Sequence, residues 1–214
     1  MRLHRFYITD PLEGKSVVVT NRDLIHQWRK VFRYNVGSQV IVFDGSGTEC
    51  HCAIMKMSPS EAELSVLATK EIAAPPKNIW LCLSLIKKDN FELVVQKAVE
   101  LGVSHVVPIV AERSEKKNIH TERLNKIIVE ATEQSGRGEL LTVHDVTTLE
   151  HLFEKGILPQ EKIFFHPEYP EIQKYLSSDT GQYSVAYFVG PEGGWSEKEI
   201  EVFKKYNMSG FSLG

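Results

Sequence analysis

Apolar strand-like runs alternate with amphipathic segments through most of the chain after residue 77, and this pattern restricts the fold more than any other feature. Strands that are apolar along their whole length must be covered on both faces, as in a parallel sheet between layers of helices. The pattern therefore predicts an α/β domain with a parallel sheet. The expected strands are 79–85, 105–110, 163–165 and 185–189, and the clearest helices are 89–101 and 121–134.

The first part of the chain has a different periodicity. One helix is expected at residues 21–32, where Asn21 can cap the first turn and apolar residues recur at helical spacing. Short β-branched and aromatic runs around this helix predict a small barrel or sandwich, with strands at 5–9, 15–20, 39–43, 50–55 and 62–67.

A proline-containing segment separates the two patterns. Pro75 and Pro76, in Ala73-Ala74-Pro75-Pro76-Lys77, interrupt both helix and sheet. We therefore expect a β-rich domain at 1–72, a linker at 73–77 and an α/β domain at 78–214.

The composition excludes several classes of protein. The chain is 42% hydrophobic and 25% charged, which is ordinary for a folded domain and unlike disordered or fibrous chains. No apolar run is long enough to span a membrane, and three cysteines are too few for a disulfide framework, so we expect a cytoplasmic protein. Cys50-His51-Cys52 resembles half of a zinc site but lacks further ligands at suitable spacing. Cys50 and Cys52 are better explained as core residues on one face of a strand, and no metal site is predicted.

A loop with three glycines is the sharpest signal of a binding site. Gly190-Pro191-Glu192-Gly193-Gly194 follows a predicted buried strand and precedes Ser196, whose spacing to Glu199 is that of a capping box. Open α/β sheets bind ligands at the carboxyl ends of their strands, and glycine lets a ligand approach the main chain. The spacing fits neither the dinucleotide motif nor the P-loop, and Glu192 would repel a phosphate. We therefore expect a ligand that is cationic or donates hydrogen bonds; a tight turn without a ligand is the alternative.

An arginine between two glycines is the second signal. Arg137 follows a predicted helix in the segment Glu133-Gln134-Ser135-Gly136-Arg137-Gly138. Released from the helical path, its guanidinium can pair with a phosphate or with a developing anion on a base. A glycine-capped helix end with a solvated arginine explains the pattern equally well.

Basic and aromatic residues are mixed near the amino terminus. The first 33 residues carry seven Lys and Arg against three Asp and Glu, although the net charge of the chain is −3. Arg5, Lys30 and Arg33 lie close in sequence to aromatic residues, a mixture that RNA-binding proteins use for backbone contact and base stacking. The alternative is a barrel core of aromatic residues with a solvated basic face.

Taken in order, five segments resemble the RsmE-type methyltransferases of the SPOUT superfamily. These enzymes methylate N3 of a uridine in the 16S ribosomal RNA of the small ribosomal subunit and use S-adenosylmethionine. The resemblance runs from residue 4 to the last residue, and the segments that carry it are Arg5-Phe6-Tyr7, Lys30-Val31-Phe32-Arg33, Gln96 to Val103, Glu133 to Arg137 and Gly190 to Gly194.

The resemblance implies a fold, an assembly and a set of site residues. The fold would be a PUA-like β-barrel that docks RNA, followed by a SPOUT-like α/β domain with a C-terminal trefoil knot, in a homodimer. We expect Arg137 to stabilise the deprotonated uracil or a nearby phosphate, and Glu133 to orient the base or accept its proton. Arg5, Lys30 and Arg33 would hold the RNA backbone. The cofactor would lie against Phe165, His166, Gly190, Pro191, Glu192, Gly193, Gly194, Leu213 and Gly214.

The end of the sequence departs from this family. Its members continue from the position of Leu213-Gly214 into a tail that passes through the knot and closes the adenine pocket. The resemblance therefore implies a C-terminally truncated chain with impaired binding. Two other functions fit the same residues: a non-catalytic RNA-binding protein, and a SPOUT methyltransferase that acts on a different RNA nucleoside.

Overall fold

The computed structural model describes residues 3–12, 14–115, 117–172 and 184–213. The chain divides into two compact units. The first unit comprises residues 1–74 and 129–140, and the second comprises residues 75–128 and 141–214. Residues 72–77, between the last strand of the first sheet and the first strand of the second, have no regular structure.

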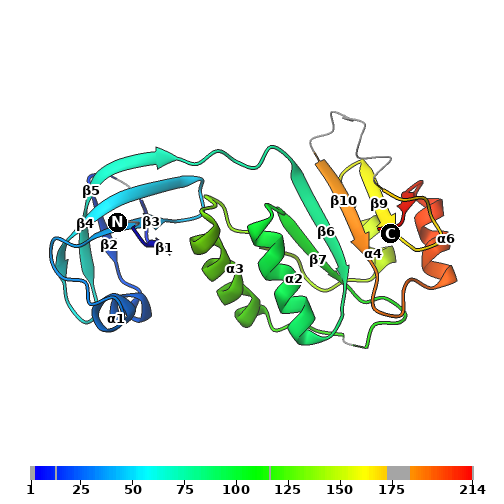
Figure 1. The fold of residues 1–214 in the computed structure, drawn as a ribbon, viewed down its shortest axis with the longest axis horizontal. Coiled ribbons are helices and arrows are strands. Elements are labelled where there is room, and N and C mark those ends of the chain that lie inside the picture. The colour runs from blue at the N-terminus through cyan, green and yellow to red at the C-terminus, as the bar shows by residue number, and fades with distance from the viewer. Residues whose placement is uncertain (1–2, 13, 116, 173–183, 214) are drawn as a thin grey trace. The chain divides into compact units, whose positions relative to one another are not determined.

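A five-stranded sheet forms most of the first unit (Figure 1). Its strand order is β1-β3-β4-β5-β2; β1 and β3 are parallel, and the other neighbouring pairs are antiparallel. Buried and more exposed residues alternate along β2, the spacing expected of a sheet with one face on a core. The strands are β1 (Arg5–Tyr7), β2 (Ser16–Val19), β3 (Gln39–Phe43), β4 (Thr48–Met57) and β5 (Ala62–Glu71).

Helix α1 (Arg22–Lys30) packs its apolar face onto this sheet. Asn21 caps it, since its side-chain oxygen accepts hydrogen bonds from the main-chain nitrogens of Asp23 and Leu24, both at 3.1 Å. Trp28 is fully buried in the same core as Cys50 and Cys52. The predicted helix and the predicted core position of the two cysteines are therefore confirmed.

The first unit also contains the end of helix α3 (Thr121–Ser135) and the segment after it, up to residue 140. Gly138 lies close against the sheet residues: a Cβ atom at this position would be 2.9 Å from the Cβ of Ile72 and 3.1 Å from the Cα of Gly47. Gly47 donates its main-chain N–H to the Gly138 carbonyl oxygen at 3.2 Å. A residue without a side chain is required for this approach.

A six-stranded, entirely parallel sheet forms the centre of the second unit, in the order β11-β9-β10-β6-β7-β8. The predicted parallel sheet is thus confirmed. Figure 1 shows β6, β7, β9 and β10 running side by side. The strands are β6 (Asn78–Ser84), β7 (His105–Ile109), β8 (Thr142–Val143), β9 (Glu161–Phe165), β10 (Ser184–Val189) and β11 (Ser209–Phe211).

Helices α4 (Leu149–Glu154) and α6 (Glu197–Lys205) contribute to the core on one face of this sheet, where Leu152 and Phe203 pack with Phe164 and Phe188. Helix α2 (Lys88–Glu100) buries Phe91 and three smaller apolar residues. Strands β8 and β11 and helix α4 are not predicted from the sequence. No helix in the described part of the chain is long and apolar enough to span a membrane.

Candidate functional site

The carboxyl ends of three adjacent parallel strands meet at one edge of the second unit. In the order β11-β9-β10, these strands end at Phe211, Phe165 and Val189. Phe211 is in register with Phe165, and the main-chain N–H of His166 donates to the Phe211 carbonyl oxygen at 2.8 Å. The segments that follow these strands contain the residues expected to hold a cofactor. Gly214 lies outside the described residues.

The glycine loop after β10 is a tight turn with an exposed main chain. The Gly194 N–H donates to the Pro191 carbonyl oxygen at 2.8 Å, and Gly194 has a φ of 69°, in the region that favours glycine. Glu192 and Gly193 are exposed, whereas Pro191 is buried. A Cβ atom placed on Gly194 would meet no atom within 4 Å, so there is open space beside the main chain.

Two side chains hold this turn in place. Arg113, which follows β7, donates from Nη1 to the Gly193 carbonyl oxygen at 2.7 Å. Glu199 is buried in the first turn of α6, where its Oε2 accepts from the Ser196 N–H at 2.8 Å and completes the predicted capping box. Its Oε1 accepts from the Glu112 N–H at 3.0 Å. One carboxylate thus connects the segment after β7 with the helix that follows the glycine loop.

The remaining residues expected to hold a cofactor lie at or just after the ends of β9, which is next to β10, and of β11, which is next to β9. Leu213 is 70% exposed, and Phe165 and His166 are half-buried. His166 is oriented locally, because its Nδ1 accepts from the Glu168 N–H at 3.2 Å and its ring lies edge-on to that of Tyr169. A ligand at this edge would meet exposed main chain, apolar side chains, the His166 ring and the exposed Glu192 carboxylate, with the Arg113 guanidinium beside Gly193. The Glu192 carboxylate in this loop favours a positively charged group over a phosphate.

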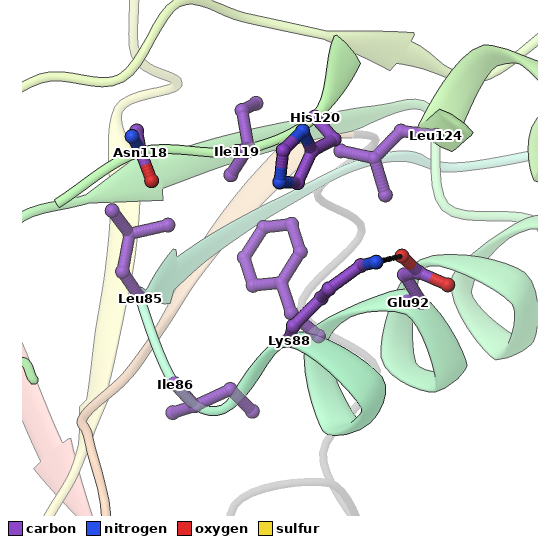
Figure 2. Close-up of a pocket in the computed structure, with 9 residues that line it drawn as sticks. Leu85, Ile86, Lys88, Glu92, Asn118, Ile119, His120 and Leu124 are labelled. Atoms are coloured by element: carbon purple, nitrogen blue, oxygen red, sulfur yellow. Dashed lines mark ion pairs between the residues drawn. The ribbon is translucent and has the colours of Figure 1, made fainter. Parts of the chain in front are cut away.

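A small cavity of about 120 Å³ lies in the second unit, near the end of β6 and the starts of α2 and α3 (Figure 2). Leu85 follows β6, and Asn118 to His120 precede α3. Figure 2 shows the Lys88 ammonium directed towards the Glu92 carboxylate, one turn further along α2, in a 3.7 Å ion pair. The cavity lining combines apolar side chains with the polar residues Asn118 and His120 and the Lys88–Glu92 pair.

In the first unit, Glu133 packs against strand β1. Its Oε1 accepts a hydrogen bond from the Tyr7 main-chain N–H at 2.9 Å. Burial raises the pKa of the Glu133 carboxyl; the Tyr7 hydrogen bond and Arg5 oppose this shift, and the charge of Glu130 adds to it. The Glu133 carboxyl therefore binds a proton more readily than that of a solvated glutamate.

Arg137 follows the end of α3, after Gly136 turns the chain with a φ of 80°. Its side chain is half-buried, and burial lowers the pKa of the guanidinium while the charge of Glu139 opposes that shift. Glu133 and Arg137 thus lie in one unit, at the end of one helix, as the sequence predicts from their spacing.

Arg5 is held inside the first unit. Its Nε donates to Glu49 Oε2 at 3.0 Å, its Nη1 to the Thr132 carbonyl oxygen at 3.1 Å, and its Nη2 to the Arg137 carbonyl oxygen at 2.9 Å. The guanidinium carbon lies 4.5 Å from the centre of the Phe43 ring. These contacts give Arg5 a structural role, and its predicted contact with RNA stays a prediction.

Lys30 and Arg33, the other two predicted RNA-binding residues, are exposed. Arg33 has a φ of 55°, a left-handed conformation that a residue with a side chain rarely adopts. The carbonyl oxygen of Arg33 accepts from the Asn35 side-chain amide at 3.2 Å, which helps to fix this turn. Two exposed cations therefore stand at the end of α1.

Sequence reasoning missed Arg113 as a support of the glycine loop, Glu49 as the partner of Arg5, and one of the two contacts of Glu199. Arg113 follows a predicted strand end, but no local motif marks its contact with a glycine 80 residues later. Glu199 is visible as part of the capping box, yet its second hydrogen bond, to Glu112, spans 87 residues. Long-range contacts of this kind leave no signal in local spacing.

Family models match both parts of the chain. The model of an RNA methyltransferase domain matches residues 73–214, and that of an RNA methyltransferase PUA domain matches residues 29–67. The first match covers the whole second unit and also residues 129–140 of the first unit. The second match covers the last two residues of α1, strands β3 and β4 and most of β5. The predicted combination of a PUA-like unit with an α/β unit is thereby confirmed.

Relatives can be aligned along nearly the whole chain. The ribosomal RNA small subunit methyltransferase E of Bacillus subtilis is 31% identical over 202 residues, covering 88% of this chain and 78% of that protein. The protein of the same name from Rickettsia conorii is 26% identical and covers 100% of this chain and 88% of that protein.

A solved structure has the same fold. The ribosomal RNA small subunit methyltransferase E of Neisseria gonorrhoeae, crystallised with S-adenosyl methionine, superposes with a TM-score of 0.85. The alignment covers 100% of this chain and 90% of that one at 24% sequence identity.

Proposed function

This chain belongs to the RsmE family of ribosomal RNA methyltransferases, and from that premise we propose that it methylates N3 of a uridine in 16S ribosomal RNA with S-adenosylmethionine. The observation that carries the proposal is the meeting of three strand ends, at Phe165, Val189 and Phe211, around an exposed glycine turn. Parallel α/β sheets bind their ligands at such an edge.

The residues at this edge fit the cofactor. S-Adenosylmethionine bound there would supply a methyl group on a positively charged sulfur, for direct displacement by a ring nitrogen. The main chain of Gly193 and Gly194 would lie against it, and the exposed Glu192 carboxylate favours its positive charge. Phe165, His166, Pro191 and Leu213 would complete the contact surface, together with Gly190. Gly214 is included by its position in the sequence.

The substrate requires a different set of groups. Uridine N3 carries a proton at neutral pH, so the enzyme must remove that proton or stabilise the anion that remains. We assign Arg137 to stabilising the anion or a neighbouring phosphate. Glu133 would orient the base or accept the proton, and its raised pKa brings it closer to the operating pH of a base. Lys30 and Arg33 would contact the RNA backbone.

The proposal also includes a cytoplasmic homodimer with a knotted α/β domain, as the family resemblance implies.

N3 is a Watson–Crick atom, so the target base must be unpaired or rotated out of its stack. The RNA must therefore present it in an open conformation.

The test is the mass mapping of ribosomal RNA from cells that lack the gene. Loss of one methyl group from a uridine of 16S RNA, restored by the purified chain with S-adenosylmethionine, is the expected result. A change at a different nucleoside would assign another substrate. RNA binding without methyl transfer would identify a non-catalytic RNA-binding protein.

A further inference from the structure

We propose that a pocket in the first unit binds a single unpaired nucleobase of the RNA substrate; this inference rests on the proposed function. The pocket has a volume of about 300 Å³. It is bounded by β1 and the residues before it, by α1 and the residues after it, and by the end of α3. We call it the β1–α1 pocket, and the lining residues that matter here are His4, Arg5, Gln27, Phe32, Glu133 and Gln134.

One wall of the β1–α1 pocket is a fixed aromatic ring. Phe32 stacks on Tyr34 with 5.3 Å between ring centres and an interplanar angle of 13°, and it meets Phe6 edge-on at 5.3 Å. The ring of His4 lies 4.6 Å from that of Phe32 and its side chain is exposed. Aromatic and imidazole rings held in this way are platforms on which unpaired bases stack.

Two amides supply groups that can read the edge of a base. Gln27 on α1 and Gln134 on α3 line the pocket, and both are exposed. Within the described part of the chain, neither amide has a hydrogen-bond partner. Each amide can donate and accept, which matches the mixed donors and acceptors of a base edge.

The charges favour a base rather than a phosphate inside the pocket. Glu133 contributes a carboxylate to the lining, while the positive charge of Arg5 is engaged by Glu49 and two carbonyl oxygens. A phosphate placed there would meet an acceptor-only carboxylate, whereas a neutral base can donate an N–H to it.

The cations suited to a phosphate lie just beside the lining residues. Lys30 is three residues after Gln27 on α1, on the same helical face, and Arg33 directly follows Phe32. Arg33 holds its left-handed conformation, with a φ of 55°, next to the stacking ring. Strained residues of this kind concentrate at binding sites. A nucleotide with its base in the pocket would place its phosphate near these exposed cations.

The base could be the methylated uridine itself or a neighbouring unpaired nucleotide, and both are recognised by the same stacking and amide contacts. RNA fragments with one abasic nucleotide at a time distinguish them. The proteins to compare are the full chain, the Gln27→Ala and Gln134→Ala variants, and Gln39→Ala as a matched control. Gln39 is also exposed in the first unit, and its Oε1 lies 3.2 Å from His51 Nε2, away from the pocket lining.

We expect Gln27→Ala and Gln134→Ala each to weaken binding of intact RNA by roughly fivefold to tenfold, and Gln39→Ala to leave it unchanged. One abasic position should weaken binding to the unmodified protein by about tenfold or more and have a much smaller effect on the two variants. That position identifies the bound nucleotide. If every abasic substitution weakens the variants and the unmodified protein equally, or if the protein binds no RNA, the pocket does not hold a base.

Methyl transfer to 16S RNA by the unmodified protein is measured on the same preparation. If the loss of one base weakens RNA binding only when Gln27 and Gln134 are both present, and no methyl transfer is observed, the pocket is supported and the proposed function is overturned. If methyl transfer is observed but the loss of a base weakens binding equally with and without Gln27 or Gln134, base binding in the pocket is overturned and the proposed function is unaffected.

Discussion

Nη2 of Arg5 donates a hydrogen bond to the main-chain carbonyl oxygen of Arg137, 132 residues further along the chain, at 2.9 Å. The same guanidinium donates to the carbonyl oxygen of Thr132, so it supports the main chain on both sides of Glu133. A basic residue that the sequence assigns to RNA contact therefore positions the segment that we assign to the reaction.

Arg5→Lys should destabilise the first unit. An ammonium group cannot replace the planar guanidinium, which reaches Glu49 and two carbonyl oxygens at once. We expect a loss of about 2–4 kcal/mol in the free energy of unfolding, measured from urea denaturation. Lys30→Ala, at an exposed position, is the control and should change the free energy little. Equal stability of Arg5→Lys and the unmodified chain would show that the Arg5 contacts are dispensable.

Glu199→Gln should weaken the support of the glycine loop. The Ser196 and Glu112 N–H groups bond to different carboxylate oxygens, and glutamine replaces one of these oxygens with an NH2 donor, so one N–H loses its acceptor. We expect the free energy of unfolding to fall by about 1–3 kcal/mol. The affinity for S-adenosylmethionine, measured by calorimetry, should also fall. Glu201→Gln, an exposed position on the same helix, should have no effect on either. Unchanged cofactor affinity in Glu199→Gln would separate the capping box from the binding site.

Arg137→Ala should lower the rate of methyl transfer by about 100-fold or more, because a positive charge would no longer stabilise the anion on the uracil. The affinity for S-adenosylmethionine should be unchanged, which calorimetry measures on the same protein. Methylation at the normal rate with normal cofactor affinity would remove Arg137 from the reaction.

The exposed cations predict a salt dependence of RNA binding. Lys30→Ala and Arg33→Ala should each weaken binding and reduce the slope of log K against log salt concentration by about one. Titrations at several potassium chloride concentrations measure this slope. A slope that stays the same in both variants would place the RNA backbone elsewhere.

Two neighbouring histidines predict that stability falls in mild acid. His144 Nε2 lies 3.3 Å from His105 Nδ1, and both rings pack on Trp80. Burial lowers the pKa of both imidazoles; each is further affected by nearby charge, His105 by His144, and His144 by Lys155, with Asp145 opposing.

Since their pKa values are lower in the folded chain than the ordinary 6.5, the unfolded chain binds more protons in mild acid. The contribution to stability is therefore present above about pH 6.5 and is lost as the pH falls. Thermal unfolding should show a lower Tm near pH 5.5 than near pH 7.5, by about 2–4 °C for each kcal/mol lost. His144→Gln should reduce this difference, and His26→Gln, at an exposed position on α1, should preserve it. A pH dependence that is identical in the unmodified chain and His144→Gln would contradict the assignment.

Local patterns in the sequence predict most of the secondary structure. Continuous apolar runs identify β6, β7, β9 and β10, and capping chemistry identifies the starts of α1 and α6. The short strand β11 escapes prediction because Ser209–Phe211 has neither alternation nor an apolar run, and it forms by pairing with β9. Strand β8 has two residues and is missed for the same reason.

The sites are predictable only in part. Residue spacing places Glu133 and Arg137 together and puts the glycine loop at a strand end. The contacts of Arg5, Arg113 and Glu199 join residues that are far apart in the sequence, so local patterns do not predict them. The family resemblance identifies the site loops but not the side chains that hold these loops in place.

The first unit includes residues 129–140, which follow β6, α2 and β7 of the second unit in the chain. During synthesis, residues 1–74 leave the ribosome before Gly138 can close against Gly47 and Ile72. A gene fusion that encoded residues 1–74 alone would contain all five strands of the first sheet but would lack the segment that packs Gly138 against Gly47 and Ile72.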